Sequence, residues 1–201
     1  LNSGGVRGIK LEKNNFVISQ SVLKHSFIEM SIRNDYLKYA SGIRKDNNNK
    51  SRDDFNELQK NEEFLLAVTT KGFGKRSSAY EYRIAGRGGQ GITGIELGRS
   101  KKQRPSNIVA AFTVCDGDQI MMVSDGGQII RCPIDQISLV GRSARGVTVF
   151  KLAEAESLVS VSRLRDENGE EEGPDVDEGV TDDAGASSRV VDDAGTKNQA
   201  N

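Results

Sequence analysis

The sequence repeats itself at a fixed offset, and this repeat limits the possible folds more than any other feature. Residues 66–92 align with residues 121–147 without a gap. The coinciding glycines and arginines are Gly72 with Gly127, Arg76 with Arg131, Gly86 with Gly141, Arg87 with Arg142, and Gly91 with Gly146. Self-similarity at a fixed period is typical of proteins that stack one structural unit several times. A β-sandwich with chance similarity is the alternative that this match disfavours.

Each repeat contains short apolar runs that end at turns containing glycine. Residues 64–70 and 119–124 are such runs, and Asp125-Gly126-Gly127 follows the second one. Asp116-Gly117 separates residues 108–114 from residues 119–124, which predicts a hairpin between them. Short strands repeated at this period favour an all-β fold built from propeller-like blades.

A third copy of the repeat opens the chain. Residues 6–11 resemble residues 145–150, and each is followed by an apolar stretch, at 16–22 and 157–164 respectively. We therefore expect about three blades, which would form part of a ring. The chain begins at Leu1 rather than at methionine, so we expect it to belong to a longer protein.

Two segments do not follow the repeat. Residues 29–62 are polar and rich in asparagine, and we interpret them as a loop insertion, with a possible short helix near 52–62. Residues 166–201 have few large apolar side chains and no period, which predicts a disordered tail. We therefore expect residues 1–165 to form the folded domain of the chain.

The net charge of −1 hides an uneven distribution of charge. Residues 166–201 contain 12 acidic and 2 basic residues, which leaves residues 1–165 with 26 basic and 17 acidic residues, a net charge of +9. A basic body indicates a protein that binds a polyanion, and an acidic tail can compete for the same surface.

The sequence favours a cytoplasmic protein. Its only cysteines, Cys115 and Cys132, form no paired motif, which fits a reducing compartment. There is no signal peptide, and no apolar run approaches the ~18 residues of a membrane span.

Residues 86–91 match the G-x-G-x-x-G pattern of dinucleotide-binding loops. That function would need a strand before the loop and a helix after it. The residues that follow look like a strand, and the aligned copy, residues 141–146, lacks the inner glycines. We therefore interpret the loop as a connection between blades that presents arginines outward.

Basic residues recur at equivalent positions of the repeats, which predicts a stripe of charge along the blades. Such a stripe would contact phosphates and carry little sequence information. The candidate DNA-binding residues are Arg7, Lys75, Arg76, Arg83, Arg87, Arg99, Lys101, Lys102, Arg104, Arg131, Arg142 and Arg145.

No catalytic or metal-binding constellation is apparent in the sequence. His25 is the only histidine, and the two cysteines are interpreted as small core residues. The tyrosines, at positions 36, 39, 80 and 82, are expected to pack rather than to cleave DNA.

The motifs together resemble the C-terminal domain of the bacterial DNA gyrase A subunit. The resemblance covers roughly residues 63–165 and 5–23. The stretches that carry it are residues 72–76, 81–83, 86–91, 116–118, 124–127, 140–142 and 145–147.

The resemblance implies a β-pinwheel, a propeller-like ring of six blades with DNA bent around its basic rim. The parent would be an ATP-dependent type II topoisomerase, using ATP and Mg²⁺, that introduces negative supercoils. The gyrase B subunit would bind outside this chain, as would the second A subunit. The chain itself would carry no cofactor and no catalytic residue.

The chain departs from the family in lacking the basic, glycine-rich box of the first blade, of which residues 86–91 are a degenerate version. We therefore assign it to the later blades. One alternative is the A subunit of topoisomerase IV, which has a smaller ring and decatenates DNA. Another is a β-propeller that binds proteins, against which the repeated arginines argue.

Overall fold

The structure is a computed structural model that describes residues 4–24, 27–46, 52–98 and 106–165. These residues belong to one compact unit, Leu1–Glu167. The predicted acidic tail lies outside the described residues. No helix among the described residues has the length and apolar character that crossing a bilayer requires.

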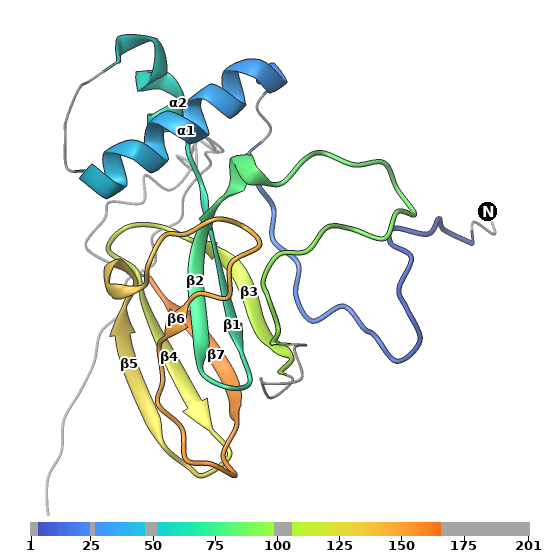
Figure 1. The fold of residues 1–201 in the computed structure, drawn as a ribbon. Coiled ribbons are helices and arrows are strands. Elements are labelled where there is room, and N and C mark those ends of the chain that lie inside the picture. Colours follow the sequence, from blue (N-terminus) through green and yellow to red (C-terminus); the bar gives the residue numbers. More distant parts are fainter. Residues whose placement is uncertain (1–3, 25–26, 47–51, 99–105, 166–201) are drawn as a thin grey trace, which may run out of the picture. The chain divides into compact units, whose positions relative to one another are not determined.

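Two antiparallel sheets form the body of the molecule (Figure 1). The first has the strand order β3-β1-β2-β6 and contains β1 (Phe64–Thr69), β2 (Phe73–Ser78), β3 (Ile108–Val114) and β6 (Val147–Thr148). The second has the order β5-β4-β7 and contains β4 (Gln119–Ser124), β5 (Ile129–Pro133) and β7 (Leu158–Leu164). The prediction of an all-β, blade-based fold is confirmed.

The repeat in the sequence is a repeat in hydrogen bonding. Phe64 pairs with Ser78 in the first hairpin, and the residues at the equivalent positions of the second, Gln119 and Pro133, also pair. The irregularity between residues 68 and 69 recurs between residues 123 and 124. A 3-10 turn follows each hairpin, η2 (Ala79–Glu81) and η3 (Ile134–Gln136).

The two sheets share one hydrophobic core. Side chains from β1, β3, β4, β7 and the loop before β7 pack there, and the partly buried Cys132 contacts them. The fully buried members include Leu66, Val68, Ile120, Met122, Ile134 and Leu158. Cys115, which we expected to be a core residue, is exposed.

The predicted hairpin at Asp116-Gly117 is wrong. A turn does form, with Gly117 at φ +87°, but β3 pairs with β1 while β4 pairs with β5 and β7. Asp118 is buried, accepts a hydrogen bond from the N–H of Cys115 at 2.6 Å and forms an ion pair with Arg163 of β7 at 2.7 Å. The turn dipeptide sets the local bend, whereas the ion pair between Asp118 and Arg163 joins this turn to β7 of the other sheet.

The segment 29–62 is a helical unit rather than a loop. It contains α1 (Met30–Asp46), η1 (Asp53–Phe55) and α2 (Asn56–Lys60), of which only the last two lie where a short helix was expected. Tyr36 and Ala40, one helical turn apart, are buried with Phe55 and Tyr80. The Tyr36 ring lies edge-on to both aromatic partners, with centroids 5.6 Å apart. The sequence did not predict α1, because Tyr80, which covers the buried face of this helix, comes from the turn after β2.

The N-terminal copy of the repeat forms no strand among the described residues. Residues 16–22 were expected to be a strand, yet Phe16 and Val22 are 76% and 86% exposed. The expected third blade is therefore represented only by an extended segment, and the described residues hold two sheets. A strand needs a neighbour, and no hairpin in the described residues offers one to residues 16–22.

Candidate nucleic-acid interface

The glycine loop of the second repeat, residues 141–146, is docked on the outer edge of β2. Val140 N–H donates to the carbonyl of Arg76 at 2.9 Å, and Val147 pairs with Gly74 on the far side of the loop. Gly146 has φ +89°, and a Cβ built on it would overlap the carbonyl oxygen of Gly74. Only glycine fits this position, because it needs both a positive φ and close contact between backbones.

Lys75 lies beneath this loop and is 0% exposed, so it cannot contact DNA as predicted. Its Nζ donates to the carbonyl of Gly141 at 2.8 Å and to that of Arg142. The pKa of Lys75 is lowered to about 8, chiefly by burial and also by the nearby Arg142, although the Glu81 carboxylate acts in the opposite direction. Lys75 pairs with Ala67, so its side chain lies on the face of the sheet opposite to Leu66 and Val68, and the docked loop covers it there.

Arg76 also makes structural contacts, and its side chain is largely shielded from solvent. Its side chain is 12% exposed, with Nε donating to the carbonyl of Ile137 at 2.8 Å and Nη1 paired with Asp116 at 3.2 Å. These bonds tie the first sheet to the turn region of the second repeat. We therefore remove Arg76, together with Lys75, from the candidate DNA-binding set.

Arg142 and Arg145 are half-buried at the docked loop. Arg142 N–H donates to Glu81 Oε2 at 2.5 Å, and its guanidinium donates to the carbonyl of Thr93. The Arg145 guanidinium lies 3.8 Å from the centroid of the Phe73 ring. A guanidinium has five N–H donors, so each side chain keeps donors for a phosphate.

The glycine loop of the first repeat, residues 86–91, is mostly exposed and contacts the N-terminal segment. Gly88 N–H donates to the carbonyl of Gly8 at 2.8 Å, and Lys10 N–H donates to the carbonyl of Gly89 at 2.8 Å. This pairing brings the exposed side chains of Arg7 and Arg87 to one region. The two segments lie side by side on the right of Figure 1.

Contacts join the two glycine loops into one rim. The Arg142 guanidinium reaches the carbonyl of Thr93, and Glu96 N–H donates to the carbonyl of Ala144 at 3.4 Å. Residues 92–98 therefore connect the exposed loop to the docked loop. We define the rim cations as Arg7, Lys10, Arg83, Arg87, Arg142 and Arg145.

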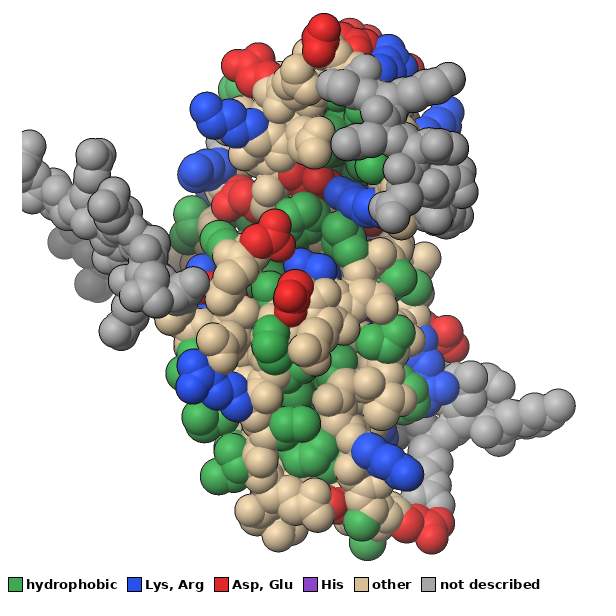
Figure 2. Space-filling model, turned by 90° about the vertical axis from the view of Figure 1, so that its left-hand side faces the viewer, with side chains coloured by type: hydrophobic (Ala, Val, Ile, Leu, Met, Phe, Trp, Pro, Cys, Tyr) green, Lys and Arg blue, Asp and Glu red, His purple; other side chains and the backbone are tan. Residues whose placement is uncertain are grey.

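Among the remaining predicted DNA-binding residues, Arg131 is described by the structure and does not belong to the rim cations. Arg131 is exposed on β5, and its Nε donates to Gln119. In Figure 1, the green segment with residues 86–91 lies on the right and β5 lies on the left. Figure 2 shows this side of the molecule, where basic side chains stand singly among apolar ones. Residues 99, 101, 102 and 104 lie outside the described residues.

Two residues of this region, Lys10 and Glu81, were not among the predicted site residues. Lys10 has no basic counterpart in the aligned copy, so periodicity could not identify it. Glu81 was part of a family motif, but only the fold shows that its carboxylate holds the neighbouring repeat.

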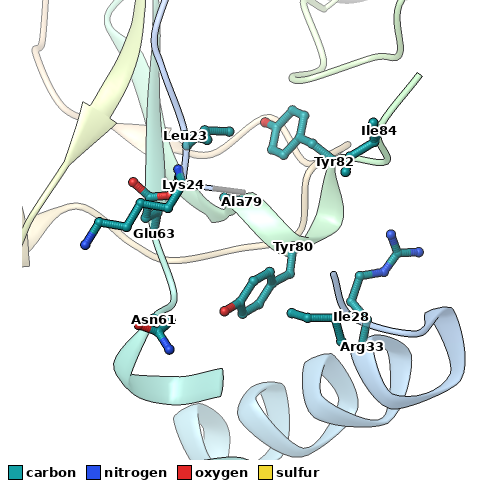
Figure 3. A pocket seen from close by; sticks show the side chains of 10 residues that line it. All are labelled: Leu23, Lys24, Ile28, Arg33, Asn61, Glu63, Ala79, Tyr80, Tyr82 and Ile84. Carbon is teal, nitrogen blue, oxygen red and sulfur yellow. Dashed lines mark hydrogen bonds between the residues drawn. The ribbon is translucent and has the colours of Figure 1, made fainter. Parts of the chain in front are cut away.

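Pockets and glycine motifs give no sign of a nucleotide or metal site in the described part of the chain. Residues 92–98, which follow the exposed loop, form neither the helix that a dinucleotide site needs nor the strand that the sequence predicted. A pocket of about 420 Å³ lies between η2 and the helical unit and is lined by Tyr80, Tyr82 and Arg33 among others (Figure 3). Within the described ranges, no cluster of His, Cys, Asp or Glu could hold a metal ion.

The residues that match a known protein family include both copies of the internal repeat. Residues 2–22, 63–114 and 118–165 match the family described as DNA gyrase C-terminal domain, beta-propeller. Residues 23–62, which include the helical unit, lie outside this match.

Two similar relatives are the DNA gyrase A subunits of Granulibacter bethesdensis, 41% identical over 87% of this chain, and of Rickettsia prowazekii, 36% identical over 90%. The chain spans 21% of the length of each. A solved structure of a DNA gyrase A C-terminal domain is 35% identical, with a TM-score of 0.45, covering 50% of this chain and 33% of that one. The chain belongs to the family of DNA gyrase C-terminal domains.

Proposed function

We propose that this chain binds duplex DNA along the rim cations and bends it, as the DNA-wrapping part of a DNA gyrase A subunit. The observation that carries the proposal is the joining of two arginine-bearing glycine loops, one from each repeat, into one rim. Cations arranged along a connected edge can follow a phosphate backbone, and such contacts position DNA without reading its sequence.

The longer protein would be an ATP-dependent type II topoisomerase of the cytoplasm that uses Mg²⁺ and introduces negative supercoils. The relatives that cover most of this chain are A subunits of DNA gyrase, which supports this proposal over topoisomerase IV. The B and second A subunits of gyrase would assemble through parts of the protein that this chain does not include. Strand cleavage would also occur there.

Salt dependence of duplex binding tests the proposal. Binding of the 201-residue chain to linear duplexes of different sequence is measured at increasing salt. Affinity should be equal for all sequences and should fall linearly on a log–log plot, because each neutralised phosphate releases condensed counterions. Failure to bind in dilute buffer, or an affinity that ignores salt, would favour a protein-binding propeller instead.

Removal of residues 166–201 tests whether the acidic segment competes with DNA for the rim. The segment has 12 acidic and 2 basic residues, and the truncated chain should bind the same duplex more tightly at low salt. Unchanged or weaker binding would reject competition as its role.

A further inference from the structure

The contact between the two repeats contains a polar clamp, which we define as the buried Lys75 and the half-buried Glu81. Both belong to the first repeat, and both hold the docked loop of the second. Lys75 Nζ donates to the carbonyls of Gly141 and Arg142, while Glu81 Oε2 accepts the N–H of Arg142 at 2.5 Å. The clamp thus holds both hydrogen-bonding groups of the Arg142 backbone.

Burying the Lys75 ammonium group costs free energy, and folding of the blade does not require a lysine at this position. Lysine is almost never fully buried unless it is paired, and the hydrogen-bond acceptors of this amine are two backbone carbonyls of the other repeat. An apolar side chain could fill the same position on β2 without the cost of desolvating an ammonium group.

The second repeat shows that the clamp is dispensable for folding a blade. Ile130 and Gln136 stand at the positions of the second repeat that are equivalent to Lys75 and Glu81. The second sheet nevertheless has the equivalent hairpin register, the equivalent strand irregularity and the equivalent 3-10 turn. Lys75 and Glu81 therefore serve the contact between repeats rather than the blade that contains them.

We propose that Lys75 and Glu81 are positioning residues that set the path of bound DNA by fixing residues 141–146 against the first repeat. This proposal rests on the DNA-binding function proposed above. Arg142 and Arg145 belong to the clamped loop, whereas Arg7 and Arg87 belong to the exposed loop region. The clamp fixes the geometry between these two groups of cations, and that geometry determines the curvature that a duplex must adopt to contact both.

The test separates DNA binding from DNA bending in the full 201-residue chain. The variants are K75M, which keeps side-chain length without a donor, E81A, which removes the acceptor, and E81Q, which keeps one. Lys38 lies on α1 with its side chain 82% exposed, so K38M is the matched control for loss of a lysine. Each variant is assayed for affinity to a short linear duplex, for the linking-number change after ligation of a nicked circle, and for thermal unfolding.

K75M and E81A should bind the short duplex within about threefold of wild type, because neither removes a phosphate-contacting cation. Their linking-number change per bound chain should fall by roughly half or more, because the preorganised geometry between the two groups of cations is lost. E81Q and K38M should match wild type in both assays. A loss confined to bending, and rescued by glutamine at position 81, is not what simple unfolding produces.

Other results would overturn the proposal in distinguishable ways. Folded K75M and E81A proteins that change linking number like wild type would show that the clamp does not set the DNA path. A wild-type chain that binds duplex without bending it would refute the clamp's role alone. A wild-type chain that binds no duplex would refute the proposed function itself. If K75M fails to fold, the comparison of E81A with E81Q decides.

Discussion

The two glycine loops occupy equivalent positions in the repeat but have different surroundings. Residues 141–146 are docked on β2, where Lys75 and Glu81 hold their backbone. Residues 86–91 are mostly exposed and are held by two backbone hydrogen bonds to residues 8 and 10. The last glycine of each loop, Gly91 or Gly146, has a positive φ, whereas Gly88 of the exposed loop has a positive φ that its equivalent Ser143 lacks. The two loops thus share their last step but differ in their inner residues and in what holds them.

Substitution of the last glycine of each loop should give the largest difference in the free energy of unfolding between the two loops. Gly146→Ala places a Cβ onto the Gly74 carbonyl at φ +89° and should reduce the free energy of unfolding by about 3 to 5 kcal/mol. Gly91→Ala has the same backbone strain, but the nearest atom to its Cβ, Ile9 Cδ1, is 3.8 Å away, so it should cost about 1 kcal/mol. Urea unfolding of the two variants measures the difference.

Equal destabilisation by these two substitutions would show that backbone strain alone, and not docking, accounts for the glycine requirement. Gly86→Ala is the matched control, since its Cβ would meet no atom within 4 Å and its φ is not positive. It should leave the free energy of unfolding unchanged within about 0.5 kcal/mol.

The fold was predictable from the sequence where it is repeated, and less so elsewhere. The predicted apolar runs 64–70, 108–114 and 119–124 contain β1, β3 and β4, because short apolar runs that end at turns specify strands. The pairing of the strands was harder to predict from the sequence. Asp116-Gly117 specifies a turn, but the pairing of β3 with β1 joins residues far apart in the chain, such as Phe64 and Val114.

The candidate site was predictable only in part, for the same reason. The sequence identifies arginines on the glycine loops, and Arg7 and Arg87 are indeed exposed. It cannot show that Lys75 points into the contact between repeats, because the loop that covers it, at Gly141, comes much later in the chain. Charge in a sequence therefore indicates a polyanion binder more reliably than it indicates which cations reach the surface.

The clamp should make stability depend on pH in a direction that is unusual for a hydrogen-bonded cation. The pKa of Lys75 is lowered from 10.5 to about 8, so between these values the unfolded chain binds the extra proton. The free energy of unfolding should therefore rise with pH across this window, by about 3 kcal/mol at most. Below pH 8 the full cost of burying the ammonium group is present.

The measurement is the urea midpoint of wild type and K75M from about pH 7 to pH 10.5, which spans both pKa values of Lys75. The difference between the two proteins isolates Lys75, because other groups titrate in both. Wild type should gain stability relative to K75M as the pH rises. Parallel curves would mean that the Lys75 amine is not desolvated in the folded chain, and the contrast between the loops would then lose its electrostatic basis.

The affinity for DNA should fall more when a rim cation is removed than when a cation of β5 is removed, although this difference is smaller than the stability effects above. Arg87 and Arg131 are both exposed, but only Arg87 belongs to the rim cations. Arg87→Ala should weaken binding to a linear duplex about fivefold at low salt and reduce the slope of the salt dependence by about one phosphate contact. Arg131→Ala should change affinity less than about twofold, because Arg131 belongs to β5, bonds Gln119 of β4 and is not one of the rim cations.

The same pair of variants decides where DNA lies on the protein. Both substitutions remove one positive charge, so a general loss of attraction would weaken binding equally in the two proteins. A larger loss for Arg131→Ala would move the DNA path to the face that contains β5, and the repeat equivalence of Arg76 and Arg131 would then matter more than the joined loops. A larger loss for Arg87→Ala places the duplex along the glycine loops, where the exposed loop contributes loosely held contacts and the clamped loop contributes a fixed one.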